Sequence, residues 1–163
     1  QGRKIYAQTK WREPDSMVLA GYIAEGLKFY KPQVCFIEGG GLGGPIIDRL
    51  YQLGWGDVVI EVNPGVKLKE TEECMNHRSK WWNAMRDGLK EGMELPEDPE
   101  LDNQLAMVEY SYNDKMQLQM QKKEDMAYSP DRADQIALTF CQGNVIVSSK
   151  DAMPLEMPVM GCV

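Results

Sequence analysis

Hydrophobic residues recur along the first part of the chain with two different patterns. Over residues 17–30 they repeat at helical spacing, directly after Pro14-Asp15-Ser16, which is typical of a helix start, and Pro32 ends the pattern. Residues 33–38 and 57–62 are instead almost continuously apolar, as expected for strands buried on both faces. Between these two segments, a helix is predicted to begin at Pro45 and to end near Gly54.

The segment that precedes these elements is also predicted to be a strand. Residues 3–11 alternate imperfectly, with Ile5, Ala7 and Thr9 on one side. The resulting order is strand, helix, strand, helix, strand. This order implies right-handed crossovers and a largely parallel α/β sheet.

The second part of the chain predicts more helix and one further strand. A long helix is predicted over residues 71–92, then a solvated acidic connection and a shorter helix that reaches about Val108. Residues 115–121 alternate strictly, which indicates a half-exposed strand or hairpin arm. A last helix is expected over residues 129–141. Residues 1–142 are therefore predicted to form one domain, and residues 143–163, which show no clear period, a tail.

Composition agrees with a globular protein. The 163 residues are enough for one ordinary domain, and 43% of them are hydrophobic while 26% are charged. No apolar run approaches the length of a membrane span, and no amino-terminal signal pattern occurs. These features argue against a membrane protein and a secreted precursor.

The charge balance limits how the chain could bind nucleic acid. The net charge is −7, so binding must depend on local basic patches, metal ions or parts of a larger protein. The four cysteines, Cys35, Cys74, Cys141 and Cys162, show no paired spacing, which predicts free thiols in a reducing compartment. Because Gln1 is followed almost at once by a strand pattern, the sequence is expected to be cut from a longer polypeptide.

Glu38 and the glycine-rich segment after it are the first candidate for chemistry. The acid stands at the carboxyl end of a predicted central strand, where open α/β sheets place ligand sites. The segment GGGLGG over residues 39–44, which includes Gly39, Gly41 and Gly44, predicts a flexible loop that another molecule can approach closely.

The same glycines also satisfy the dinucleotide-binding pattern G-x-G-x-x-G between a strand and a helix. Glu61 ends the next strand about 20 residues later, as that pattern requires. Two details count against a dinucleotide. Glu38 would place a negative charge beside the pyrophosphate, and Pro45 removes an N–H group from the helix start that should hold it.

Asp131 and Asp134 are the second candidate. Ser129 and Pro130 suit the cap and the first position of a helix, so these residues could serve only to start it. The two aspartates, however, share one helix face beside an apolar stripe, where acids are costly without a cationic partner. Carboxylates are the ligands that Mg²⁺ and Mn²⁺ prefer.

The order of these motifs resembles the nuclease domain of the large terminase subunit, the DNA-packaging protein of tailed bacteriophages and prophages. The resemblance covers about residues 2–142 and is carried by the segments IEGGGLGGPIIDRL, NHRSKWWNAMRDGL, LPEDPELDNQLAMVEYSY, KKEDM and SPDRADQIALTF. It implies an RNase H-like fold, a mixed sheet with helices on both faces. It also implies an endonuclease in the host cytoplasm that uses two Mg²⁺ or Mn²⁺ ions to cut concatemeric double-stranded DNA.

The resemblance assigns roles to particular residues. Glu38 corresponds to the acid after the central strand, and Asp131 and Asp134 to the acid or acids of the last helix, as catalytic metal ligands. Which aspartate is the main ligand stays open. Lys123, in the KKEDM segment, corresponds to a family motif. It is expected to contact DNA phosphates, and the basic residues Lys122, Arg78, Lys80 and Arg132 are further candidates.

Two parts of the complete packaging protein are not found in the sequence. The family carries a first metal-binding Asp on a strand before residues 3–11, so this chain is expected to lack that strand and to show weak metal binding and little cleavage alone. No G-x-x-x-x-G-K-[ST] phosphate loop occurs, which excludes the ATPase motor from this sequence. The implied partners are DNA, the ATPase domain, the small subunit and the portal protein.

Two alternatives to a nuclease are retained. One is a Rossmann-type oxidoreductase domain, and the other is a non-catalytic module that docks DNA or the portal. The remaining conspicuous residues have structural interpretations. His77 is expected to be a solvated or locally bonded helix residue, and Trp81 and Trp82 are expected to pack their helix on the sheet, with one of them possible at the surface.

Overall fold

The computed structural model describes residues 3–141, which divide into two compact units. The first unit contains residues 8–63, and the second contains residues 64–141 together with residues 3–7. The predicted domain end at residue 142 stays a prediction, and the predicted tail lies outside the described residues. The chain mixes helices with a small parallel sheet, which confirms the α/β class.

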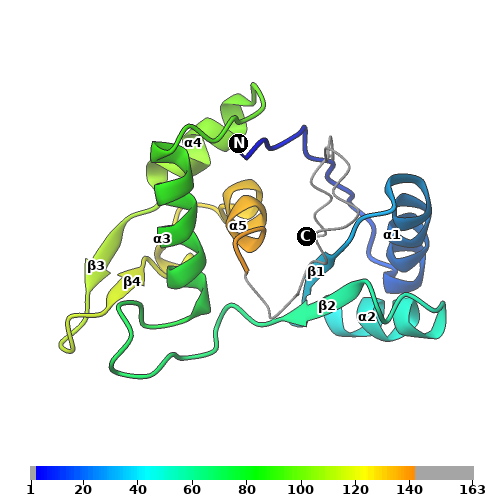
Figure 1. Ribbon diagram of the computed structural model, residues 1–163, viewed down its shortest axis with the longest axis horizontal. Coiled ribbons are helices and arrows are strands. Elements are labelled where there is room, and N and C mark those ends of the chain that lie inside the picture. The colour runs from blue at the N-terminus through cyan, green and yellow to red at the C-terminus, as the bar shows by residue number, and fades with distance from the viewer. Residues whose placement is uncertain (1–2, 142–163) are drawn as a thin grey trace. The chain divides into compact units, whose positions relative to one another are not determined.

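The first unit is a short strand–helix–strand arrangement with an additional helix in front (Figure 1). Its elements are α1 (Ser16–Tyr30), β1 (Cys35–Glu38), α2 (Gly43–Gln52) and β2 (Val59–Val62). β1 and β2 pair in parallel, with Glu38 opposite Val62. α2 packs against both strands and against α1, and the shared core includes Ile23, Leu27, Ile37, Ile46, Leu50 and Val59.

The first helix begins where the sequence predicts it. Asp15 Oδ1 accepts hydrogen bonds from the backbone N–H groups of Met17 at 2.7 Å and Val18 at 3.4 Å, which caps α1. Lys31 adopts a left-handed conformation, with φ of 48°, and donates its N–H to Leu27 O, which ends the helix before Pro32.

The second unit combines three helices with a β-hairpin (Figure 1). Its elements are α3 (His77–Lys90), α4 (Pro99–Met107), β3 (Tyr110–Tyr112), β4 (Leu118–Met120), the 3₁₀ helix η1 (Lys123–Asp125) and α5 (Asp131–Leu138). α3 packs against α5 and β4, and α4 packs against α5. The antiparallel pairing of β3 and β4 confirms the predicted hairpin arm.

The predicted strand over residues 3–11 is wrong. This segment forms an isolated parallel bridge between Lys4 and Glu94, and it divides between the two units after Ala7. Of the three residues predicted to share one side of this strand, Ile5 is buried, whereas Ala7 and Thr9 are exposed. Over residues 3–141 the named strands therefore form two separate two-stranded sheets and not one mixed sheet.

The long helix begins at His77, six residues later than predicted. Asn76 Oδ1 accepts from Ser79 N at 2.9 Å and thereby caps α3. The preceding residues follow β4 as extended chain, because Met75 N donates to Leu118 O and Leu118 N donates to Glu73 O. The apolar side chain of Cys74 is thus buried beside the hairpin and does not continue the helical stripe.

Both tryptophans of α3 are buried, each at 6% exposure, so the expectation that one could lie at the surface is not met. They pack within the second unit. None of the described helices is long and apolar enough to cross a membrane.

Candidate functional site

Glu38 lies at the carboxyl end of β1, and its side chain is exposed. The chain turns sharply after it, since Gly39 N donates to Val62 O on the neighbouring strand and Gly43 N donates to Gly40 O. Gly41 has a φ of 57°, a conformation that glycine adopts without strain. The exposed carboxylate therefore stands beside a turn that keeps the backbone accessible, as the sequence predicts.

Two glycines of this turn have close neighbours, and the neighbour of Gly43, which is backbone, requires a glycine there. A methyl group on Gly43 would overlap the carbonyl oxygen of Glu38, and one on Gly39 would overlap the carboxylate of Glu61. A methyl group on Gly40 would instead lie 3.8 Å from Glu38 Oε1. The glycine segment thus lets α2 approach β1 closely and leaves room for two carboxylates above the turn.

Glu61 is the second of these carboxylates. It lies on β2 next to Val62, it is exposed, and its side chain reaches Gly39, the first residue after the adjacent strand β1. Two acids thus occupy the carboxyl edge of the parallel strand pair, where α/β proteins commonly bind ligands. Sequence reasoning considered Glu61 only for a dinucleotide, although its place at the end of the neighbouring buried strand was a signal for a second acid at this edge.

In the second unit, Asp134 is the centre of a polar cluster formed with Arg78, Trp82 and Lys123, here called the Asp134 cluster. Its Oδ1 accepts from Trp82 Nε1 at 2.7 Å and from Arg78 Nε at 3.0 Å. Arg78 Nη1 also donates to Gln121 O at 2.8 Å, and its guanidinium lies 5.7 Å from the Trp82 ring centre. These contacts join α3, α5 and the segment between β4 and η1.

The other oxygen of Asp134 has a different environment. Lys123 Nζ lies 2.9 Å from Oδ2, but this ion pair lacks hydrogen-bond geometry, so the buried Oδ2 has no hydrogen-bond donor. The buried Nη2 of Arg78 likewise has no acceptor. The side chains of Asp134 and Arg78 are 17% and 13% exposed, whereas that of Lys123 is 44% exposed. One carboxylate is thus matched by two cations, and one oxygen and one N–H group remain unsatisfied.

Asp131 is the first residue of α5 and is partly buried. Its Oδ1 accepts from Ser129 Oγ. The expected cap at Ser129 is not formed, because Pro130 holds the cap position and Gln104 of α4 supplies the acceptor. Gln104 Oε1 accepts from Arg132 N at 2.8 Å and from Ala133 N at 3.2 Å. Sequence reasoning missed this role, since a long-range cap leaves no local signal.

The residues predicted to contact DNA differ in their surroundings. Arg132 binds Asp98 Oδ2 at 2.9 Å and Glu100 Oε2 at 3.0 Å, so part of the acidic connection is an ion-pair partner and not merely solvated. Arg78 is held by Asp134, and Lys80 lies 3.6 Å from Glu72. Lys122 and Lys123 are exposed beside η1. Lys80, Lys122 and Lys123 are therefore exposed, whereas Arg78 and Arg132 are mostly buried in ion pairs.

The structure brings some of the predicted site residues together and leaves others in different units. Lys123, Arg78 and Asp134 meet in one cluster, and Asp131 is on the same helix as Asp134. Glu38 belongs to the first unit, so its convergence with either aspartate stays a prediction. Across residues 3–141, His, Cys, Asp and Glu side chains form no group of three or more that could hold a metal ion.

The two carboxylate sites differ in how well they fit a divalent cation. At the Asp134 cluster, the one carboxylate already pairs with Arg78 at 3.0 Å and Lys123 at 2.9 Å, so the described side chains of this cluster alone do not fit a divalent ion. At the turn, the exposed oxygens of Glu38 and Glu61 are ligands of the type that Mg²⁺ and Mn²⁺ prefer. The pair of acids at the turn therefore fits a divalent ion better than the Asp134 cluster does.

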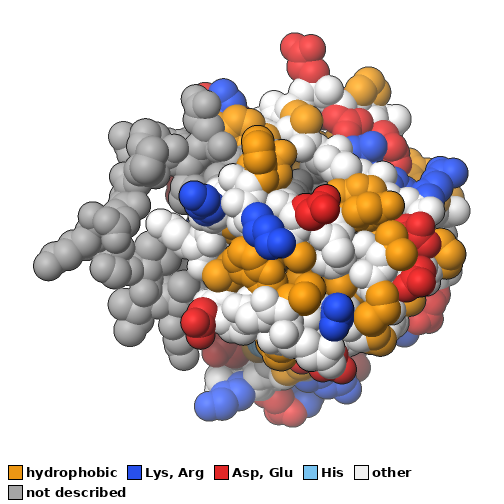
Figure 2. Space-filling model, turned by 90° about the vertical axis from the view of Figure 1, so that its right-hand side faces the viewer, with side chains coloured by type: hydrophobic (Ala, Val, Ile, Leu, Met, Phe, Trp, Pro, Cys, Tyr) orange, Lys and Arg blue, Asp and Glu red, His pale blue; other side chains and the backbone are white. Residues whose placement is uncertain are grey.

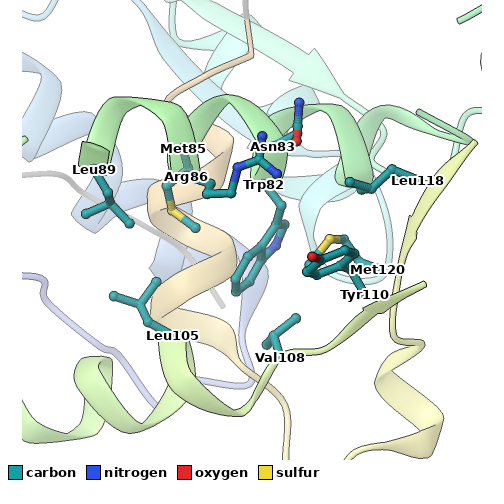
Figure 3. Close-up of a pocket in the computed structure, with 10 residues that line it drawn as sticks. All are labelled: Trp82, Asn83, Met85, Arg86, Leu89, Leu105, Val108, Tyr110, Leu118 and Met120. Carbon is teal, nitrogen blue, oxygen red and sulfur yellow. The ribbon is translucent and has the colours of Figure 1, made fainter. Parts of the chain in front are cut away.

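A cavity of about 170 Å³ lies in the second unit, between α3, α4 and the hairpin. Figure 3 shows the Trp82 indole extending from α3 toward Val108 and Tyr110, with Met85 and Leu105 nearby. The lining is mainly apolar, and Arg86 and Asn83 supply its polar groups. Trp82 therefore has two environments: its ring lines this cavity, and its N–H group binds Asp134.

The first unit has an exposed apolar face on α1. Met17, Val18, Tyr22, Phe29 and Tyr30 are all exposed, and Phe29 reaches 79%. Several of them line a groove of about 520 Å³ that also includes Trp11 and Glu25. Figure 2 shows hydrophobic side chains gathered on the face of the molecule that lies to the right in Figure 1.

The remaining conspicuous residues have structural roles. His77 begins α3 and stacks on Trp81, with 5.6 Å between ring centres. Cys35, Cys74 and Cys141 are free thiols, and Cys162 lies outside the described residues. Burial raises the pKa of the Cys35 thiol to about 11, and burial followed by the charge of Glu73 raises the pKa of Cys74.

Comparison with known proteins finds no family model and no curated sequence that matches this chain.

Proposed function

We propose that this chain is a divalent-metal-dependent endonuclease domain of the RNase H-like class, which cuts double-stranded DNA during phage genome packaging. The proposed metal ligands are Glu38, Asp131 and Asp134. The resemblance of the sequence motifs to terminase nuclease domains supports the reaction class and the residue roles, and the exposed position of Glu38 at the end of β1 supports the role of that acid.

The observation that carries the proposal is the position of Glu38. An exposed carboxylate at the carboxyl edge of two parallel strands, beside a turn whose glycines keep the backbone open, suits a ligand that must approach closely. Ordinary turns do not require the close contact that Gly43 makes with the backbone of Glu38. A role in binding explains both the acid and the glycines.

When bound, two divalent ions would supply hydrolytic chemistry by activating water and stabilising the leaving oxygen. The chain's own residues hold and orient the two aspartate carboxylates. Arg78 and Trp82 fix the Asp134 carboxylate through Oδ1, and Ser129 orients Asp131. Lys122 and Lys123 provide positive charge for DNA phosphates.

The activity test uses the longest natural polypeptide that contains this sequence, because the family site also includes an Asp from an earlier strand. Glu38→Gln, Asp131→Asn and Asp134→Asn are compared with wild type in cutting supercoiled plasmid DNA with Mn²⁺. Replacing a residue that is an essential ligand is expected to lower the rate of DNA cutting at least about 100-fold. Asp48→Asn, which changes an exposed residue of α2, is the control and should cut normally. Unchanged cutting by Glu38→Gln would refute the assignment.

The test also separates the two aspartates. A large loss with Asp131→Asn and a small one with Asp134→Asn would make Asp131 the main ligand, and the reverse result would select Asp134. Because Asp134 also holds α3 to α5, its variant must be shown to unfold at a similar urea concentration before a loss is assigned to metal binding.

The docking alternative is supported by one observation, the exposed apolar side chains of α1. Loss of all cleavage with retained binding to DNA or to portal protein would favour that alternative. A dinucleotide role is less well supported, because Gly43 N already donates to Gly40 O and Pro45 has no N–H group for a phosphate. Saturable NAD binding would revive it.

A further inference from the structure

We propose that the cavity between α3, α4 and the β3–β4 hairpin is a binding site for a small aromatic carboxylate, with the ring inside the cavity and the carboxylate at Arg86. The cavity lies within the second unit. None of its lining residues is a proposed metal ligand, so this site and the nuclease proposal stand or fall separately.

The interior of the cavity is an apolar slot that the protein leaves unfilled. Its buried part is formed by Trp82 and Met85 of α3 and by Leu118 of β4, which are 6%, 2% and 6% exposed. The other walls are half-buried apolar side chains from α3, the end of α4 and β4, namely Leu89, Leu105, Val108 and Met120. Because protein interiors are normally close-packed, and because this surface is apolar, an apolar occupant that displaces water is favoured.

The size and lining of the cavity select a single aromatic ring. Its volume is about 170 Å³, and an apolar protein cavity of about 150 Å³ is large enough to bind benzene. The indole of Trp82 and the phenol of Tyr110 both face it (Figure 3), and aromatic pairs gain more than the area they bury. The flexible thioethers of Met85 and Met120 can follow the outline of a ring. One ring with a short side chain therefore fits this space.

The polar groups of the lining favour a carboxylate on that side chain. Asn83 and Arg86 are three residues apart on α3 and so share one face of the helix. Arg86 Nε and Nη2 both donate to Asp87 Oδ1, at 3.1 and 3.0 Å, whereas Arg86 Nη1 and the Asn83 amide donate to no other described residue. Asp87 is also shared with Lys90, at 3.8 Å, so one acid faces two cations. A second carboxylate would balance this charge through Nη1.

Trp82 connects an occupant of the cavity with a measurable signal. Its ring lines the cavity, and its Nε1 donates to Asp134 Oδ1 at 2.7 Å. Trp81, the preceding residue, does not line the cavity and stacks on His77, with 5.6 Å between ring centres. The indole N–H groups of these two tryptophans therefore serve as a probe of the cavity and as an internal reference.

The test titrates phenylacetate into the whole chain and follows the indole N–H signals by two-dimensional NMR, with Trp81→Phe and Trp82→Phe to assign them. The Trp82 signal should shift saturably, with a dissociation constant of about 1 mM for a ligand of about ten non-hydrogen atoms, and the Trp81 signal should shift much less. Arg86→Gln should weaken binding about threefold to fivefold, because it removes an ion pair at a half-exposed position. Lys90→Gln, an exposed cation of α3 outside the lining, is the control and should weaken it less than about twofold.

Two comparisons test the ring and the charge separately. Benzyl alcohol has the ring without the charge, so wild type and Arg86→Gln should bind it equally. Val108→Phe and, independently, Leu105→Phe place extra volume in the cavity and should each weaken phenylacetate binding at least about tenfold. Equal phenylacetate affinity in wild type and Arg86→Gln would overturn the carboxylate assignment. Absence of a saturable Trp82 shift with both ligands, or unchanged binding by the folded cavity-filling variants, would overturn the site.

Discussion

The thiol of Cys35 shows how burial of one side chain changes the stability of the protein with pH. Cys35 is the first residue of β1, and burial raises the pKa of its thiol from 9.0 to about 11. Between these values the unfolded chain loses the thiol proton while the folded chain keeps it. The unfolded state then binds fewer protons, so the free energy of unfolding falls as pH rises from about 9 toward 11.

This difference predicts that wild type loses about 1 kcal/mol more stability than Cys35→Ala between pH 8 and pH 10. Urea unfolding followed by circular dichroism at the two pH values measures it. Cys74 is present in both proteins, so its own ionisation cancels in the comparison. An equal decrease in both proteins would show that the Cys35 thiol ionises as it does in the unfolded chain.

At the scale of elements, the start of α5 depends on a residue from another helix. Gln104 is 2% exposed and accepts from two backbone N–H groups at the start of α5, which has no side-chain cap of its own. Gln104→Ala would leave both donors buried without an acceptor. It is expected to lower the free energy of unfolding by about 1–2 kcal/mol, measured by urea unfolding.

The matched control for Gln104 is Asn103→Ala, an exposed neighbour on α4, which should change stability by less than about 0.5 kcal/mol. If Gln104→Ala were equally neutral, α5 would not depend on the cap. The same variant is also expected to increase hydrogen exchange at Arg132 and Ala133, since their amides lose their acceptor.

The close contact between α2 and β1 leads to a second prediction about stability. A methyl group on Gly43 would overlap the carbonyl oxygen of Glu38, so Gly43→Ala must move the helix or the strand. We expect it to destabilise the protein by about 1–3 kcal/mol in thermal or urea unfolding. Gly21→Ala in α1 is the control. A methyl group there meets nothing within 4 Å, so it should stabilise α1 by about 0.5–1 kcal/mol.

How far the sequence predicts these elements depends on where their signals lie. α1, β1 and β2 follow from local caps and apolar runs, and Glu38 follows from its position after β1. The start of α3 could not be predicted, because Cys74 and Met75 continue the apolar stripe but pair with β4. The Asp134 cluster joins residues 52 and 56 positions apart, so it leaves no local pattern.

For the whole molecule, the distribution of charge predicts how any DNA binding depends on salt. The net charge of −7 repels a phosphate backbone. Of the five predicted DNA contacts, Arg78 and Arg132 are mostly buried in ion pairs with acids of the second unit, and Lys80 lies 3.6 Å from Glu72. Lys122 and Lys123 remain exposed, and Lys123 is shared with Asp134. A small number of phosphate contacts is therefore expected, and binding should require a divalent ion.

Two phosphate contacts correspond to a slope of about −2 in a plot of log K against log salt concentration, since each contact contributes about −0.9. Fluorescence anisotropy with a short duplex, Ca²⁺ and increasing KCl measures this slope. Lys122→Ala should make it shallower by about one, whereas Arg132→Gln should leave it unchanged and instead weaken the attachment of α5 to α4. A slope of about −6 or steeper would mean that further cations bind DNA, and the ion pairs of Arg78 and Arg132 would then have to open in the complex.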